Sequence, residues 1–61
     1  MEYSDKHSHI ITIGDDVDVD KTEDNLEFRG TVSGFKGEFV TVEDQEENHF
    51  DVLPTEVEVV L

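Results

Sequence analysis

The fold is decided by residues 39–59, which read FVTVEDQEENHFDVLPTEVEV. Within this stretch, residues 39–43 and 50–52 are expected strands, because Val40 and Val42 in the first and Phe50 and Val52 in the second alternate with polar side chains. A period of two is typical of strands that bury one face. The polar run 44–48 lies between them and has the composition of a hairpin loop. The sequence therefore predicts two antiparallel strands joined by a short turn.

The residues after this hairpin predict one tight turn and one more strand. Pro54 ends the preceding strand, because proline cannot donate a hydrogen bond to a central ladder. Thr55 and Glu56 can cap a single helical turn. The face of the last strand is expected to consist of Val57, Val59 and Leu61.

Two more strands are expected upstream. Val17 and Val19 alternate with three aspartates, Asp16, Asp18 and Asp20. Residues 20–25 contain no core-forming side chain and predict a loop. One face of the next strand is expected to consist of Leu26, Phe28, Gly30 and Val32. Residues 33–37 then predict a glycine-containing reversal.

No segment carries apolar residues at helical spacing over three turns, and alanine, the best helix former, is absent. We therefore expect an all-β fold, a single five-stranded barrel over residues 10–61 with a one-turn helix before the last strand. Closure would remove the exposed edges of a flat sheet. Residues 1–9 are polar and lack periodicity, which predicts a flexible, disordered N-terminal tail.

Several short patterns carry a resemblance to a known fold: Gly14-Asp15-x-Val17-x-Val19, Gly30-x-Val32 with Phe35 following, and Val40-x-Val42-Glu43. Together with the ending at 50–59, they resemble the SH3-like small barrels, and the KOW-type pattern in particular, over about residues 13–61. The resemblance implies binding to RNA, ribosomes or transcription complexes. KOW-type members use basic loops for this, whereas the first loop here has Glu23 and Asp24 against Lys21.

Charge is the strongest compositional signal. Seventeen carboxylates oppose four basic side chains in 61 residues, a formal net charge of −13. Such a chain repels nucleic acid and anionic membranes at ordinary salt. The absence of cysteine excludes a disulfide framework, a thiolate zinc site and a cysteine nucleophile. Two explanations of the acidity stay open: adaptation to high salt, or a negative surface offered to a basic partner.

The candidate site residues fall into two groups. Aromatic and arginine side chains dominate binding hot spots, so the expected anchors are Phe35, Phe39, Arg29 and Lys36. Acidic side chains that would steer a basic partner are Asp16, Asp18, Asp20 and Glu23. Phe35 and Phe39 have an alternative role, which is to cover an open end of the core.

The aspartate row of the first strand has an alternative meaning as well. Side chains two apart on a strand are ~6.6 Å apart, and phosphates on one DNA strand advance ~3.4 Å. The row would therefore match every second phosphate, as a nucleic-acid mimic requires. A solvated strand face explains the same pattern. Between Asp16 and Glu27 the spacing also resembles a calcium loop, but Lys21 stands where the turn needs glycine, so we expect no metal and no cofactor.

We therefore expect a small acidic interaction module, not an enzyme, that binds a protein partner through residues 20–27, residues 33–39 and its acidic faces. The first alternative is a nucleic-acid mimic or inhibitor of a basic DNA- or RNA-binding protein. The second is a KOW-like ribosome- or RNA-associated factor from a salt-adapted organism, which would bind nucleic acid only at high salt. Without a signal peptide or an apolar span, we expect a soluble cytoplasmic protein with no membrane partner, a monomer or weak dimer.

Overall fold

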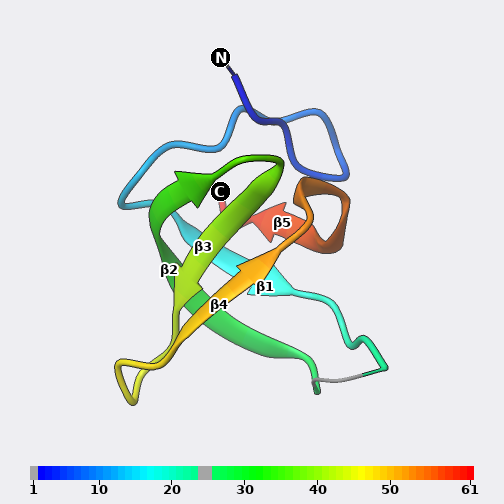
Figure 1. Cartoon of the computed structure of the whole chain (residues 1–61). Helices are drawn as coiled ribbons and strands as arrows, with labels where there is room; N and C mark the ends of the chain where they lie inside the picture. The colour runs from blue at the N-terminus through cyan, green and yellow to red at the C-terminus, as the bar shows by residue number, and fades with distance from the viewer. Residues whose placement is uncertain (1, 24–25) are drawn as a thin grey trace.

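The computed structural model describes residues 2–23 and 26–61 (Figure 1). Five strands and one short turn of 3-10 helix make up the fold. They are β1 (Asp16–Val19), β2 (Phe28–Lys36), β3 (Phe39–Glu43), β4 (His49–Val52), the turn η1 (Pro54–Glu56) and β5 (Val57–Val59). The predictions of an all-β chain, of five strands and of a single helical turn before the last strand are confirmed.

The sheet has the order β4-β3-β2-β1-β5, and every neighbouring pair is antiparallel. The closed barrel that the sequence predicts is not formed by the described strands, because β4 and β5 are the two edges of an open sheet. Only η1 and Leu53 separate these edges in the chain. Hydrogen bonds at the free edge of β5 go to the N-terminal segment instead: Lys6 N donates to Val57 O, and Val59 N donates to a carboxylate oxygen of Asp5.

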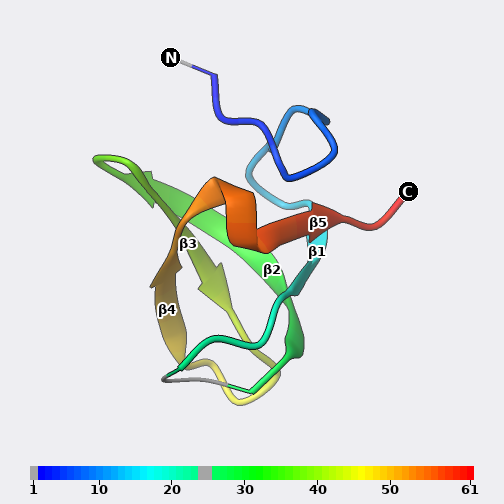
Figure 2. The ribbon, with the colours of Figure 1, turned by 90° about the vertical axis from the view of Figure 1, so that its right-hand side faces the viewer.

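The core is made almost entirely of valine. Every strand contributes to it, and the nine buried apolar residues among those that the structure describes are Ile11, Val17, Val19, Val32, Val40, Val42, Val52, Val57 and Val59. Because the inward side chains of one sheet meet in one cluster, the sheet must curl around them, as Figures 1 and 2 show. The short β-branched side chain suits such a pleated surface.

Strand β2 is longer than predicted, and the predicted reversal over 33–37 is wrong. The chain remains extended to Lys36, and the turn lies at residues 37–38. A β-bulge makes this possible: Val32 pairs with Val42, but the next pair is Gly34 with Thr41, so Ser33 is the extra residue. An inserted residue bends a strand and reverses which side chains face the core.

Two residues predicted on core faces lie outside the strands. Leu26 precedes β2 and is 77% exposed, while Leu61 follows β5 and is 92% exposed. In the sequence, the apolar–polar alternation extends to both leucines, but the backbone hydrogen bonds between strands do not reach them. Hydrogen bonding rather than side-chain pattern therefore sets these strand ends.

Gly30 occupies the tightest point of the sheet. It lies on the buried face of β2, opposite Val17. A Cβ atom at this position would come within 2.5 Å of the carbonyl oxygen of Glu43 and 2.6 Å of Val42 Cγ1. Only glycine allows β2 to pass this close to the end of β3.

Carboxylates close the turns around β4. In the β3–β4 hairpin, Asp44 Oδ1 accepts hydrogen bonds from the N–H groups of Asn48 and Glu46, both at 2.9 Å. The bond from Asn48 is the main reason that the pKa of Asp44 lies below its usual range. At η1, Glu56 Oε1 accepts from Leu53 N at 3.0 Å. Some of the chain's carboxylates therefore stabilise turns by accepting hydrogen bonds from the backbone.

The N-terminal segment, for which the sequence predicts a disordered tail, makes long-range contacts with the sheet. The described residues 2–11 fold back against the sheet, and we refer to them as the N-terminal clasp (Figure 2). The Tyr3 ring stacks on Phe35 at 4.3 Å, and its hydroxyl donates to Gly37 O. Ile11 is buried and donates its N–H to Tyr3 O at 2.8 Å. These long-range contacts leave no periodic pattern in the sequence.

Candidate functional site

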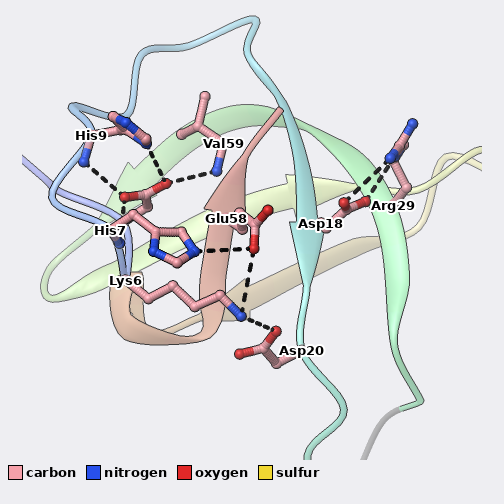
Figure 3. Close-up of polar contacts among 9 residues, drawn as sticks. Lys6, His7, His9, Asp18, Asp20, Arg29, Glu58 and Val59 are labelled. Carbon is pink, nitrogen blue, oxygen red and sulfur yellow. Dashed lines mark hydrogen bonds and ion pairs between the residues drawn. The ribbon is translucent and has the colours of Figure 1, made fainter. Parts of the chain in front are cut away.

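Charged side chains gather on the outer face of the sheet, the face opposite the core. Asp18 lies between two charged neighbours, because the strand register pairs it with Arg29 on β2 and with Glu58 on β5. Arg29 donates to both carboxylate oxygens of Asp18, at 2.7 and 3.3 Å (Figure 3). The hydrogen bond from Arg29 is the main reason that the pKa of Asp18 lies below its usual range. The predicted anchor Arg29 is thus already engaged within the chain.

The other predicted aspartates of this row also have partners. Asp16 accepts from the hydroxyl of Thr31 at 3.3 Å. Asp20 accepts from Lys6 Nζ at 2.7 Å, and this hydrogen bond raises the pKa of Lys6. The row is therefore a partly neutralised surface rather than a bare ladder of charge.

Glu23, the fourth predicted steering residue, is exposed and lies in a bend. The loop over 20–27, predicted as a contact surface, is described only in part. Asp24 and Asn25 lie outside the described residues, as does any calcium-loop reading that includes Asp24.

Phe35 is half-buried, so the alternative role that the sequence left open for it is the one found. The bulge at Ser33 turns Phe35 to the core face, where it pairs with Val40 and packs against the core. The Tyr3 ring covers it from the N-terminal clasp. A side chain packed on both sides cannot anchor a partner without displacing the clasp.

Phe39 remains available at the start of β3. It pairs with Lys36 and shares the outer-face parity of Thr41. The β3–β4 register, continued by one residue, brings it opposite Leu53. These two apolar side chains are 37% and 39% exposed, so together they form a small apolar area at the edge of the sheet.

A shallow hollow lies beside the Phe39 ring. Its lining consists of Lys36, Gly37, Glu38, Phe39 and Asp51. Thr41 donates its hydroxyl hydrogen to Asp51 Oδ1 at 2.8 Å, which orients the carboxylate. Lys36 Nζ lies 3.9 Å from the other oxygen, and its side chain is 79% exposed. The hollow thus combines an aromatic ring, an oriented carboxylate and a loosely held cation.

The predicted site residues form two regions rather than one. Arg29 and Lys36 lie near opposite ends of β2, and seven residues of strand span about 23 Å. Around Arg29 lie the aspartates of β1; around Lys36 lie Phe39 and Asp51. The expected anchors Phe35, Phe39, Arg29 and Lys36 therefore do not all lie together in one patch.

Sequence reasoning missed the most enclosed carboxylate in the described chain. The side chain of Asp5 is 0% exposed and accepts three backbone N–H bonds, each at 2.8 Å, from His7, His9 and Val59. Burial alone would raise the pKa of Asp5, but these hydrogen bonds outweigh it and hold the pKa below the usual range. The only sequence signal was a Ser-Asp pair in a short polar segment, which is also typical of a turn.

Histidines join the clasp and the hairpin to carboxylates. His7 Nε2 lies 3.2 Å from Glu58 Oε2, and His9 Nδ1 lies 3.5 Å from Asp5 (Figure 3). At the opposite edge of the sheet, His49 Nε2 lies 2.9 Å from Glu43 Oε2.

Within the described residues, no three or more His, Asp or Glu side chains gather closely enough to hold a metal ion. The same residues include no helix long and apolar enough to cross a membrane. Comparison with known protein families, with curated proteins and with solved structures finds no match for this chain. The site must therefore be interpreted from its own geometry.

Proposed function

We propose that this chain has an SH3-like fold, with its sheet open between β4 and β5, and that it acts as a non-catalytic interaction module that binds a basic protein partner through its outer face. One observation carries the proposal, the charge of that face. The carboxylates that the strands direct there are Asp16, Asp18, Glu43, Asp51 and Glu58. Against these five, the strands supply only two cations, Arg29 and Lys36.

The assignment to SH3-like barrels rests on three features of the chain. A single helical turn precedes the last strand, the first and last strands pair, and all five strands share one core. Gly14, in the Gly-Asp pair of the KOW-type pattern, has a φ of 97° in the turn before β1. Gly30, in the same pattern, lies at the close approach of β2 to β3.

Binding begins with long-range attraction in this proposal. A surface of one sign raises the encounter rate with an oppositely charged partner and makes it sensitive to salt. Short-range contact then requires an exposed anchor. Phe39 supplies it, since Phe35 is covered by Tyr3 and Arg29 is held by Asp18.

The nucleic-acid mimic is the alternative for the same charged face. A mimic needs an uninterrupted row of negative charge, and here Asp18 is neutralised by Arg29 and Asp20 by Lys6. These two ion pairs interrupt the negative row. We therefore favour a partner that contacts the remaining separate carboxylates over one whose groove fits a continuous row of phosphates. Competition with nucleic acid distinguishes the two.

The test uses purified DNA- and RNA-binding proteins with free basic grooves, titrated into the full chain at low and at physiological salt. We expect binding that weakens steeply with salt and is not reversed by duplex DNA or RNA. The variant Glu43→Gln should weaken it several-fold more than Glu2→Gln, which removes the same charge from the N-terminal clasp rather than from the outer face. Equal effects of the two variants, or no binding at low salt, would overturn the proposal, and reversal by duplex would favour the mimic.

Salt dependence of folding tests the remaining alternative, a KOW-like RNA-associated factor from a salt-adapted cell. We expect the proton–nitrogen NMR spectrum to stay dispersed from almost no salt to several molar, because the fold has its own valine core and turn-closing carboxylates. Collapse of the spectrum at low salt would assign the acidity to the environment instead.

A further inference from the structure

We propose that the hollow beside Phe39 and Asp51 receives the side chain of an arginine from an extended basic segment that adds as a strand to β4. This inference rests on the proposed function and names the chemistry of the partner. It assigns docking to the β4 edge in particular, rather than to the acidic outer face as a whole.

The two edges of the sheet differ in what covers them. At β5, the N-terminal clasp takes up backbone groups of Val57 and Val59. At β4, no described residue other than those of β3 forms a backbone hydrogen bond with His49–Val52. An edge strand directs alternate N–H and C=O groups away from its neighbour, and an extended peptide can pair with them. Figure 2 shows β4 on the side of the sheet away from the clasp.

Strand β4 has only four residues, so backbone pairing alone gives few bonds and no selectivity. Selection falls to the side chains beside it. The Phe39 ring is partly exposed next to the Asp51 carboxylate. A guanidinium can stack on an aromatic face and donate to a carboxylate with its edge at the same time. The hollow presents both groups on the outer face, where alternate side chains of an added strand would point.

Lys36 shows that the hollow already attracts a cation. Its ammonium lies 3.9 Å from Asp51 Oδ2, longer than the 2.7 Å of the Lys6–Asp20 pair. With its side chain 79% exposed, Lys36 loses little when an incoming arginine takes its place. Lys36 therefore acts as a weak internal competitor for the site.

The charge around this edge selects a basic segment. Residues 39–52, which form β3, β4 and their hairpin, contain no lysine or arginine. The carboxylates in that range are Glu43, Asp44, Glu46, Glu47 and Asp51. An acidic or neutral strand would meet like charge or no attraction here, whereas a basic strand meets opposite charge along its length.

The test is a titration of the isotope-labelled full chain with a seven-residue peptide that alternates arginine and threonine. We expect amide shift changes centred on Phe39 and residues 49–53. A peptide with glutamate in place of arginine should cause none. Lysine in place of arginine should weaken binding, because an ammonium cannot stack and donate in two directions at once.

Variants with matched controls assign the site. Phe39→Ala should weaken arginine-peptide binding about two- to five-fold, whereas Leu26→Ala, which also truncates an exposed apolar residue, should not. Asp51→Asn should weaken it more than Asp16→Asn, which removes an equal charge from β1. Lys36→Ala should strengthen binding more than Lys21→Ala, because only Lys36 competes for Asp51.

Three results would overturn the inference. Shift changes confined to β1 would leave the proposed function standing and remove β4 as the docking edge. Equal losses for Phe39→Ala and Leu26→Ala would remove the hollow, and absence of any binding at low salt would remove both proposals. Should Phe39→Ala lose the dispersed spectrum, Phe39→Leu carries the test, since it keeps apolar packing and lacks the aromatic face.

Discussion

The two edges of this sheet are kept from pairing with other chains in different ways. β5 is covered by the N-terminal clasp, in which the buried Asp5 carboxylate accepts the N–H of Val59 as a neighbouring strand would. β4 has no such cover among the described residues, but it is short and lies beside a hairpin rich in carboxylates. Charge and shortness both discourage pairing with another copy of the chain. One edge is thus closed by a specific acceptor, and the other is guarded only by charge.

The comparison also separates two uses of acidic residues. Asp5, Asp44 and Glu56 accept hydrogen bonds from backbone N–H groups. Removing one of these carboxylates should destabilise the fold. Asp16 and Glu43 lie on the outer face and interact with side chains, so replacing them should change binding far more than stability.

The largest expected effect comes from Gly30, where β2 passes closest to the end of β3. Gly30→Ala would bring a Cβ within 2.5 Å of Glu43 O, and backbone cannot give way as a flexible side chain can. We expect a loss of about 3 kcal/mol in the free energy of unfolding, measured by urea denaturation. Gly34→Ala is the control, because a Cβ there meets nothing within 4 Å. Similar losses for both variants would mean that close approach is not the role of Gly30.

The clasp itself should account for the next largest effect. Asp5→Ala leaves three N–H groups without their charged acceptor, and we expect a loss of about 2 kcal/mol. Asp5→Asn retains one acceptor oxygen and should lose less. Hydrogen exchange of the Val59 amide should speed up in Asp5→Ala, while amides of β4 stay unchanged. Equal acceleration at both edges would show that the clasp stabilises the whole sheet rather than one edge.

The pH dependence of the same carboxylate follows from its lowered pKa. A carboxyl group with a folded pKa below its unfolded value of about 3.9 stabilises the fold fully above that value. The stabilisation is lost as pH falls through the folded pKa. The stability difference between the natural chain and Asp5→Asn should therefore be present at pH 5 and shrink as the pH falls below about 4. Asp18 and Asp44 are present in both proteins, so their own titrations cancel in the difference.

A smaller effect is expected from the aromatic contact of the clasp. Tyr3→Ala removes the ring stacked on Phe35 and should cost about 1 kcal/mol. Phe39→Ala, at the open edge, should cost less than half of that, because Phe39 is partly exposed. Thermal unfolding of the two variants gives the comparison directly. A larger cost at Phe39 would place that ring in the fold rather than in a binding surface.

Local alternation was enough to predict most of the strands. Val17 and Val19, Val40 and Val42, and Val57 and Val59 all alternate with polar residues and are all buried. The turn before β5 was equally readable, because Pro54 and Glu56 act within a few residues of each other. Features with short sequence separation and a fixed period leave a direct signal.

The candidate site was harder to predict because it depends on register and on distant contacts. The bulge at Ser33 adds one residue to β2, and that single shift moves Phe35 to the core face and Lys36 to the outer face. The Asp5–Val59 bond joins residues 54 apart in the chain. Alternation contains no information on either event, since a bulge changes parity without changing composition.

The smallest expected effect is a gain in stability, at the open edge. Glu47 has a φ of 65° in the β3–β4 hairpin, a left-handed conformation that costs a residue with a Cβ roughly 1–2 kcal/mol. Glycine avoids this cost, but its greater conformational entropy in the unfolded chain lowers the stability of the fold by about 0.4–1 kcal/mol. Glu47→Gly should therefore stabilise the fold by about 0.5 kcal/mol, measured by urea denaturation.

Glu46→Gly is the matched control for this prediction. It removes the same charge from the same turn at a position without positive φ, so it should destabilise the fold. Opposite signs for the two variants would assign the effect to backbone conformation, and gains in both would assign it to relief of charge repulsion. In the first case, Glu47 lowers the stability of the hairpin through its backbone conformation, and its carboxylate is expected to act in attracting a basic segment to the β4 edge. In the second case, the charge that guards this edge itself destabilises the hairpin.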